Sequence, residues 1–290
     1  MLASRMPRDD GRPSCGTRAA MTSGGALIEL ARIPPMFRLH ELAAHPWLAR
    51  LEYAALMGST NDVALACARQ DSAAPLLVLA EQQTAGRGRG ANRWWSAPGA
   101  LTFSLMLDLS ADLPVARRSQ LALVAGLAVR TAIAELVDGV ELKWPNDVYV
   151  AGRKASGILI EASAARPRRA VVGIGINVNN SFLDAPEDVR QRAVSLIDYR
   201  SQPLDATALL IRLLDHFRDH LETWEAGRLN LVAEWSPYCY LTDRVIVVEA
   251  GGKRLSGRCL GITPEGALSL LTADGPVECA SGVIAAVDAR

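Results

Sequence analysis

The chain has 290 residues, of which 50% are apolar and 21% are charged. This composition is typical of a folded globular protein and excludes a chain that is disordered throughout. Its 31 basic residues balance 31 acidic ones. Because the net charge is zero, nothing in the overall charge attracts the chain to nucleic acid or to an anionic membrane, and any recognition of phosphate has to be local.

Cysteine usage and hydropathy favour a cytoplasmic setting. The five cysteines are scattered and form no C-x-x-C pair, so the sequence predicts neither a disulfide framework nor a zinc site. The longest apolar stretch, residues 121–137, is interrupted by Arg130 and Glu135 and is too short to span a bilayer. The first 25 residues carry arginines but no apolar core, which argues against a signal peptide.

Three regions follow one another along the chain. Residues 1–35 are rich in Pro, Gly, Ser and Arg without periodicity, which predicts a disordered extension. Residues 36–236 mix helical and strand patterns. Strands outnumber helices there and often follow one another directly, which favours an α+β domain. Residues 237–290 contain short strands separated by Gly-rich turns, which predicts a small β-barrel.

The elements of the larger domain can be placed from their patterns. Helices are predicted over residues 59–69, 117–137 and 204–226, and strands over 76–81, 101–107, 140–144, 148–150, 157–162 and 170–176. In the C-terminal region, strands are predicted over residues 245–248, 254–259, 267–271, 277–279 and 283–286.

A loop rich in glycine and arginine follows the strand predicted over residues 76–81. Its glycines leave backbone N–H groups free to surround an anion, and its arginines offer planar pairs of donors for carboxylate or phosphate. The pattern matches neither the dinucleotide fingerprint nor Walker A. The alternative is a solvated loop without a ligand. The residues concerned are Gly86, Arg87, Gly88, Arg89, Gly90 and Arg93, followed by Trp94 and Trp95.

A second segment runs from Lys143 through Pro145-Asn146-Asp147 to Lys154, and it contains two of the chain's three lysines. The Pro-Asn-Asp turn between two strands can bring both lysines toward one face. Two ammonium groups beside a carboxylate suit a polyphosphate with its magnesium. The alternative is a polar turn with two exposed lysines.

Two shorter segments complete the set of candidates. Gly173 and Gly175 lie in a predicted strand and allow a close approach to its backbone, and Asn177 follows them with both a donor and an acceptor. Gly58-Ser59-Thr60-Asn61 precedes a predicted helix, where its polar side chains either bind a ligand head group or simply cap the helix.

Taken in this order, the segments resemble the biotin–protein ligase family. The resemblance covers residues 58–179 and resumes weakly in the predicted C-terminal barrel. It is to the monofunctional type, because the chain lacks room for the N-terminal DNA-binding domain of the repressor type. The matching motifs are Gly-Ser-Thr-Asn, Gln-x-Ala-Gly-Arg-Gly-Arg, Lys-Trp-Pro-Asn-Asp, Lys-x-x-Gly-Ile-Leu-x-Glu and Gly-Ile-Asn.

The resemblance implies the family's fold, a mixed-sheet catalytic domain of the biotin/lipoate ligase type at residues 36–236 and a small SH3-like barrel at 237–290. It also implies a two-step reaction. The biotin carboxylate attacks the α-phosphate of MgATP to give biotinyl-5′-adenylate and pyrophosphate. A lysine of a biotin carboxyl carrier domain then attacks the anhydride and releases AMP. ATP and Mg²⁺ are co-substrate and metal, and no prosthetic group is implied. We expect no nucleic acid or membrane partner and a monomer or weak homodimer.

Motif alignment assigns roles to individual residues. Lys154 and Arg89 are the catalytic candidates: Lys154 contacts the biotin carboxylate and the α-phosphate, and Arg89 retains the adenylate. Asp147 is the candidate magnesium ligand. Biotin is held by Ser59, Thr60, Asn61, Gln83, Gly86, Arg87 and Lys154. The nucleotide is held by Arg89, Arg93, Trp94, Lys143, Asn146, Asp147 and Asn177.

The sequence departs from the family in the arginine loop, where Ala91 replaces a usual glycine and Asn92 a frequent arginine. Arg93 is the candidate substitute for the phosphate contact at position 92. Two alternatives to a biotin ligase stay open. One is a lipoate or octanoate ligase, although its Arg-Arg-x-Ser-Gly-Gly-Gly-x-Val-x-His loop is absent. The other is a non-catalytic biotin-binding protein.

Overall fold

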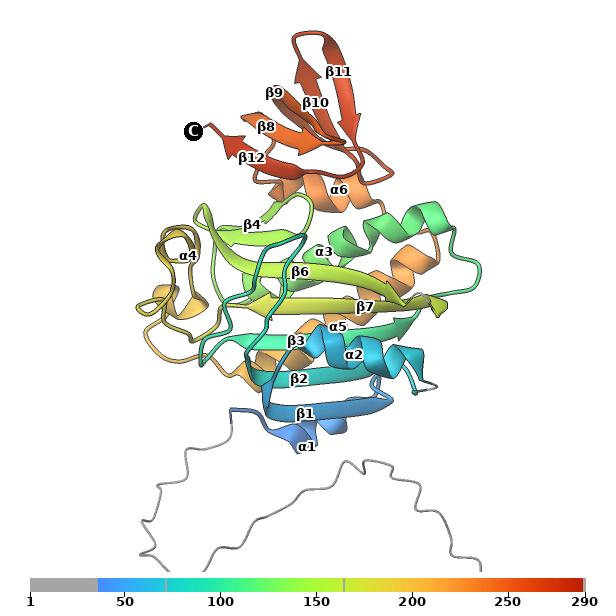
Figure 1. Cartoon of the computed structure of the whole chain (residues 1–290), viewed down its shortest axis with the longest axis vertical. Helices are drawn as coiled ribbons and strands as arrows, with labels where there is room; N and C mark the ends of the chain where they lie inside the picture. Colours follow the sequence, from blue (N-terminus) through green and yellow to red (C-terminus); the bar gives the residue numbers. More distant parts are fainter. Residues whose placement is uncertain (1–35, 71, 164, 289–290) are drawn as a thin grey trace, which may run out of the picture. The chain divides into compact units, whose positions relative to one another are not determined.

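The computed structural model describes residues 36–70, 72–163 and 165–288, and the predicted extension at residues 1–35 lies outside them. The described chain contains a mixed sheet flanked by helices and, after it, an antiparallel β domain (Figure 1). The fold is therefore α+β, as the strand-rich pattern predicts.

Seven strands form the larger sheet, in the order β1-β2-β3-β7-β6-β5-β4. Only the β1–β2 pair is parallel, and every other neighbour pair is antiparallel. This pattern agrees with a chain in which strands often follow one another without an intervening helix. The strands are β1 (Arg50–Met57), β2 (Leu76–Gln83), β3 (Leu101–Asp108), β4 (Val140–Lys143), β5 (Asp147–Val150), β6 (Arg153–Ser163) and β7 (Arg166–Ile176).

The helices α2 (Thr60–Arg69) and α3 (Leu121–Ala134) cover opposite faces of this sheet (Figure 1). Ala64 and Ala68 of α2 are fully buried and form a separate core cluster with apolar residues of β2, β3 and β7. The nearly all-apolar α3 packs beside α5 (Ala206–Glu225) in the main core. The side chain of Asp205 caps α5 by accepting from the Ala208 N–H at 3.0 Å. The short helices are α1 (Leu39–Ala43), α4 (Glu187–Arg192), α6 (Leu231–Trp235), η1 (Val115–Gln120), η2 (Leu196–Tyr199) and η3 (Ser236–Tyr238).

The C-terminal β domain is one antiparallel sheet in the order β11-β10-β9-β8-β12. All five of its strands were predicted from the alternation of short apolar runs and Gly-rich turns. It packs against the larger domain through buried hydrogen bonds, including one of 3.1 Å from the Trp144 indole to the Gly266 carbonyl. Its strands are β8 (Val245–Ala250), β9 (Lys253–Ile262), β10 (Leu268–Thr272), β11 (Gly275–Cys279) and β12 (Val283–Val287).

Several elements differ from the sequence prediction, among them the short helices α1, α4, α6, η2 and η3, which were not predicted. Strand β1 was not predicted, because it lies at the sheet edge and its residues are mostly half-buried or exposed, without the strong apolar run of the inner strands. The helix predicted over residues 117–137 begins as the 3-10 helix η1 and becomes α-helical only at Leu121. There Gln120 is held by tertiary contacts, donating to the Pro264 carbonyl and accepting from the Trp224 indole.

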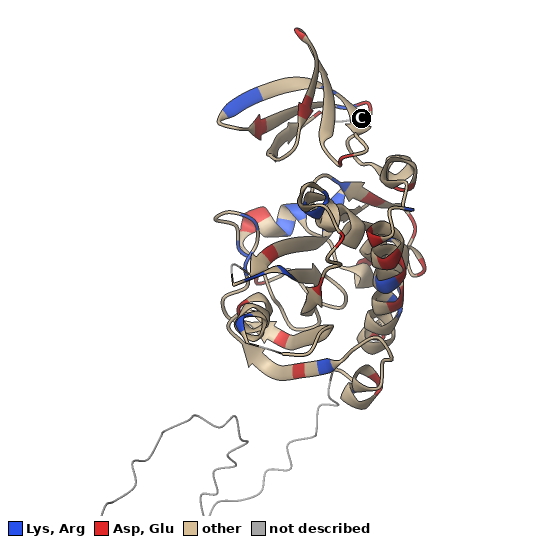
Figure 2. Cartoon of the chain, turned by 90° about the vertical axis from the view of Figure 1, so that its right-hand side faces the viewer, with Lys and Arg blue, Asp and Glu red and all other residues tan. Residues whose placement is uncertain are grey.

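In the view of Figure 2, basic and acidic residues are interspersed along the helices and strands. No helix within the described ranges has the length and apolar character needed to cross a membrane.

Candidate functional site

Three glycines on one face of β6 and β7 form the floor of the candidate site. Gly157 pairs with Gly175 across the two strands, and Gly173 lies two residues before Gly175, so all three share a face. A Cβ at Gly173 would lie within 3.0 Å of the Asn61 amide, and one at Gly175 within 3.0 Å of the Trp94 ring. The glycine pattern therefore marks a close approach, as predicted, and the side chains that approach come from other segments.

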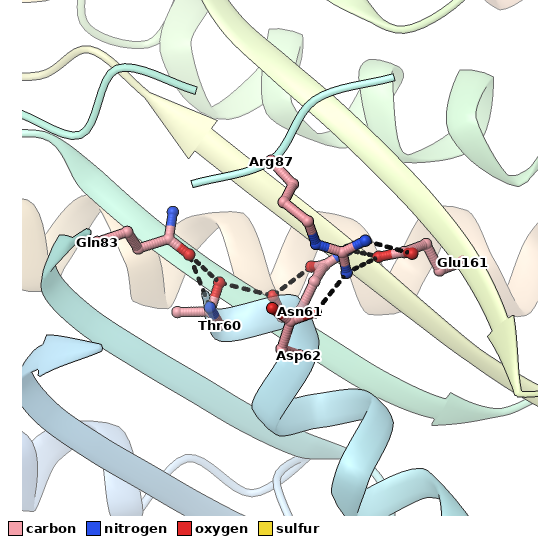
Figure 3. A network of polar contacts seen from close by, with 7 residues as sticks. Thr60, Asn61, Asp62, Gln83, Arg87 and Glu161 are labelled. Carbon is pink, nitrogen blue, oxygen red and sulfur yellow. Dashed lines mark hydrogen bonds and ion pairs between the residues drawn. The ribbon is translucent and has the colours of Figure 1, made fainter. Parts of the chain in front are cut away.

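The start of α2 lies on this floor and carries a chain of polar contacts (Figure 3). Ser59 is the N-cap residue, but its side chain makes no capping hydrogen bond. Instead, Gln83 Oε1 accepts from the Thr60 backbone N–H at 2.6 Å and lies 3.1 Å from the Thr60 hydroxyl. The Ser104 hydroxyl lies 2.8 Å from Thr60 Oγ1 and 2.5 Å from Asn61 Oδ1. Ser59, Thr60 and Asn61 are each at most 4% exposed, so these groups are fixed before any ligand binds.

Arg87 lies above α2 with its charge balanced (Figure 3). Its guanidinium donates to both Glu161 carboxylate oxygens, at 2.9 and 2.5 Å, and lies 2.8 Å from Asp62. Hydrogen bonding to Glu161 raises the pKa of Arg87 further above its ordinary value. Glu161 also accepts from the Asn61 amide at 2.8 Å. Arg87 therefore fixes the loop, and it does not add uncompensated positive charge to the site.

The glycine-arginine loop folds into a small hairpin over the floor. Gly88 N–H donates to the Asn92 carbonyl at 2.8 Å and Trp94 N–H to the Gly86 carbonyl at 3.1 Å. A Cβ at Gly86 would lie 2.7 Å from the Trp94 carbonyl, so only glycine fits this position. Trp94 is half-buried, and its indole Nε1 has no hydrogen-bond partner within the described structure.

The start of α2 forms one end of the site, and the β4–β5 turn and the start of β6 form the other. Lys154 Nζ lies 2.6 Å from the Asp147 carboxylate, and its side chain packs over Gly157, where a Cβ would lie 3.0 Å from both Cε and Nζ. The Asn177 side chain is buried and donates to the Lys154 carbonyl at 3.3 Å. Asn177, which directly follows β7, therefore supports the backbone of Lys154 on β6.

Lys143 is a half-buried cation that makes no ion pair with another described residue. Its ammonium donates to the Tyr149 hydroxyl at 2.9 Å and lies 4.8 Å from the Tyr149 ring and 6.0 Å from the Tyr240 ring. Burial lowers the pKa of Lys143 below its ordinary value, an effect that the charge of Asp147 opposes and that of Lys154 increases. Lys143 is paired with Asp147 in the register of β4 and β5, and Lys154 contacts the Asp147 carboxylate, so both lysines lie near Asp147.

Arg89 connects the arginine loop to the β4–β5 turn and to the C-terminal β domain. Its guanidinium lies 3.4 Å from the Asn146 side-chain oxygen and 3.2 Å from the Gly282 carbonyl of the C-terminal β domain. The Asn146 amide in turn donates to the Ile158 carbonyl at 2.6 Å. Arg93 is exposed and pairs through its backbone with Arg87. The structure therefore directs Arg89 toward the β4–β5 turn, whereas Arg93 lies at the outside of the hairpin.

Sequence reasoning missed several residues of this region. Ser104 had no local signal, because it is a single serine in an apolar strand. Glu161 was noted only as part of a motif. Tyr149 and Tyr240 lie beside Lys143 with their rings 4.9 Å apart, although they are far apart in the sequence. Within the described residues, no group of three or more His, Cys, Asp and Glu side chains is arranged to hold a metal ion.

A fold and a site of this kind define a class of acyl-protein ligases. The model of the Biotin/lipoate A/B protein ligase family matches residues 53–179, from β1 to just beyond Asn177. This span includes the glycine floor, the arginine loop and both lysines.

Individual relatives narrow the class. The chain is 36% identical over 228 residues to a biotin–[acetyl-CoA-carboxylase] ligase of Mycobacterium tuberculosis, covering 76% of this chain and 83% of that one. It is 32% identical over 232 residues to the bifunctional ligase/repressor BirA of Bacillus subtilis, covering 78% and 70%. The structure of the Aquifex aeolicus biotin protein ligase in complex with biotin and ATP superimposes with a TM-score of 0.70 at 28% identity, covering 82% of this chain and 98% of that one. The chain belongs to the biotin protein ligase family.

The relatives include both a ligase/repressor and a protein named only as a ligase. The monofunctional type therefore stays a prediction from the sequence.

Proposed function

We propose that this protein joins biotin to a lysine of a biotin carboxyl carrier domain through biotinyl-5′-adenylate. In the first step, a biotin carboxylate oxygen bonds to the α-phosphorus of ATP and pyrophosphate leaves. In the second step, the carrier lysine nitrogen bonds to the acyl carbon, loses a proton, and AMP leaves. The observation that carries the proposal is the single glycine-floored face on which a preordered polar cluster, Ser59, Thr60, Asn61, Gln83 and Ser104, lies beside the cations of the β4–β6 region.

The polar cluster at the start of α2 suits the uncharged ring of biotin. A cyclic urea offers two N–H donors and one carbonyl acceptor, and such a ring is recognised through fixed hydrogen bonds of matching direction. The residues that we assign to it are Ser59, Thr60, Asn61 and Gln83, with Gly86 and Arg87 of the loop as its wall. Their burial and mutual hydrogen bonds mean that little ordering remains to be done when the ring binds.

The cationic end suits the reacting groups. A carboxylate and a triphosphate repel each other, so positive charge must be supplied where they meet. Lys154 is the residue that we assign to this place, because Nζ is near the floor and is held by one carboxylate only. We assign Arg89 to the adenylate phosphate, and Arg93, Lys143, Asn146 and Asn177 to the nucleotide with it.

Magnesium accompanies ATP in this proposal. Proteins hold Mg²⁺ in nucleotide sites through one or two carboxylates together with phosphate oxygens and water. Asp147 is the carboxylate beside Lys154 and Lys143 and fits this requirement as a single protein ligand. When bound, the ion would neutralise phosphate charge.

Water must be kept from the adenylate, because the anhydride hydrolyses readily. We assign this role to Trp94 and the hairpin that carries it. The indole lies over Gly175, and its Nε1 is buried there without a hydrogen-bond partner among the described residues. We place the reaction in the cytoplasm, in keeping with the four free cysteines among the described residues.

The test is pyrophosphate release from MgATP with biotin, octanoate or lipoate as the acid. Release with biotin alone, followed by labelling of a carrier-domain lysine, is the expected result. Release with octanoate or lipoate instead would change the substrate and keep the adenylation chemistry. If the folded protein released no pyrophosphate with any of the three acids, the proposal would be wrong and a binding protein would be favoured.

A further inference from the structure

Glu161 lies where the polar cluster at the start of α2 meets the arginine loop (Figure 3). It lies on β6, on the same face as Gly157, and it contacts one residue from each of the two parts: Asn61 of α2 and Arg87 of the loop. We propose that Glu161 is a positioning residue with two effects. Through Asn61 and Ser104 it fixes the direction of the hydrogen bonds in the polar cluster, and through Arg87 it fixes the position of the loop. This inference rests on the proposed function and deepens it.

The direction of the chain of hydrogen bonds follows from what each group can donate. An ionised carboxylate only accepts, so the Asn61 amide must present Nδ2 to Glu161 and Oδ1 to Ser104. The serine hydroxyl has one hydrogen, and the 2.5 Å contact with Asn61 Oδ1 uses it. The Thr60 hydroxyl has one hydrogen and lies 2.8 Å from Ser104 Oγ and 3.1 Å from Gln83 Oε1. Because the hydrogen of Ser104 is already used, the shorter contact needs the threonine hydrogen, and Ser104 Oγ accepts it.

The consequence reaches the groups that we assign to the ring of biotin. With its hydrogen turned toward Ser104, the Thr60 hydroxyl presents a lone pair. Because Gln83 Oε1 already accepts from the Thr60 N–H, Gln83 Nε2 stays available as a donor. An acceptor at Thr60 and a donor at Gln83 match a cyclic urea, whose N–H donates and whose carbonyl accepts. Ser104 is fully buried and Thr60 is 2% exposed, so water cannot reverse these directions.

The loop is fixed by the same carboxylate. The bidentate contact joins Arg87 to β6, and the arginine backbone is part of the hairpin that carries Trp94 over Gly175. Asp62 also contacts Arg87, at 2.8 Å, but within the described structure its side chain makes no hydrogen bond to Asn61 or Ser104, and it is 59% exposed. Asp62 therefore supports the loop alone, which makes it a matched control.

Three variants separate the two effects of Glu161. In Glu161→Gln, the new amide adds a donor where only acceptors fit, so we expect the KM and Kd for biotin to rise about tenfold or more and the adenylate to escape. In Ser104→Ala, the series of hydrogen bonds is interrupted but the contact between Arg87 and Glu161 remains. We therefore expect the same rise in the KM and Kd for biotin without escape of the adenylate. In Asp62→Asn, we expect both quantities to change by at most about threefold.

The measurements are the biotin Kd by calorimetry, KM and kcat for pyrophosphate release, labelling of bystander lysines by escaped adenylate, and the thermal midpoint. The KM for ATP serves as the second readout, and it should not respond to Ser104→Ala. A merely structural role would instead change the KM for biotin and the KM for ATP together with the thermal midpoint.

A Glu161→Gln protein with Kd, KM and escape within twofold of the parent would overturn the proposal. So would an Asp62→Asn protein whose Kd, KM and escape change as much as those of Glu161→Gln. If Glu161→Gln does not fold, an unchanged biotin Kd in Ser104→Ala overturns the proposal by itself. A parent that binds biotin without releasing pyrophosphate would overturn the proposed ligase, while the Kd series would still test Glu161. A parent that does not bind biotin would overturn both.

Discussion

The two ends of the candidate site are constructed in opposite ways. At the start of α2, every charge is paired and the polar groups are hydrogen-bonded to one another, with Arg87 balanced by Glu161 and Asp62. At the β4–β6 end, Lys143 is half-buried and makes no ion pair among the described residues, and Lys154 is paired there with Asp147 only. The difference shows what each kind of ligand group requires, because a neutral ring needs hydrogen bonds of fixed direction and a pair of anions needs positive charge that the protein has not already neutralised.

The largest effect is expected at the cationic end. Lys154→Ala should lower the rate of pyrophosphate release by about 10³-fold, because it removes the ammonium where both reacting groups are negative. Lys253→Ala is the matched control, since Lys253 is an exposed lysine at the start of β9 and should behave as the parent. Near-normal release by the Lys154 variant would contradict our assignment.

The second effect concerns retention of the intermediate. Arg89→Gly removes the contacts with Asn146 and the Gly282 carbonyl together with the assigned phosphate contact. We expect about 10- to 100-fold more labelling of bystander lysines, from the loss of charge-assisted hydrogen bonds. The measurement is mass spectrometry of a bystander protein incubated with the enzyme, biotin and MgATP. Labelling confined to the carrier would argue against retention by Arg89.

The glycine floor permits a direct comparison of the two ends. A methyl group at Gly173 displaces Asn61, and one at Gly175 displaces Trp94. Gly173→Ala should therefore raise the KM for biotin about tenfold, and Gly175→Ala should mainly increase escape of the adenylate. Both variants should also lower the thermal midpoint. If the two variants gave the same kinetic profile, the division of the site into two ends would be wrong.

The smallest effect is expected at Lys143, where function and stability should change in opposite directions. Burial lowers its pKa below the ordinary value of 10.5, so the charged form destabilises the fold at neutral pH. This penalty is present below the folded pKa and fades as pH rises from there toward 10.5. Lys143→Met should raise the KM for ATP about fivefold and leave the thermal midpoint at pH 7 equal or higher. A lower midpoint would show that the contacts with Tyr149 and Tyr240 outweigh the burial of the charge.

Local patterns in the sequence were sufficient for most elements and for the ligand-binding segments. The apolar runs of β2, β3, β6 and β7, the helical spacing of α2 and α5, and the five short C-terminal strands were all predicted within a few residues of their observed bounds. These features depend on side chains close in sequence, which set burial on one face and place turns at Gly and Pro. The paired glycines of β7 were likewise a local sign that something approaches its backbone.

Only the tertiary structure decided which groups meet across those elements. The edge strand β1 and the 3-10 start at Val115 depend on neighbours rather than on their own patterns. The pairing of Arg87 with Glu161, 74 positions along the chain, turned an expected free cation into a neutralised one. Sequence by itself determined which residue types were available for the chemistry. Their charge balance and the direction of their hydrogen bonds were decided by contacts between distant segments, because each group's state depends on the partner that folding brings to it.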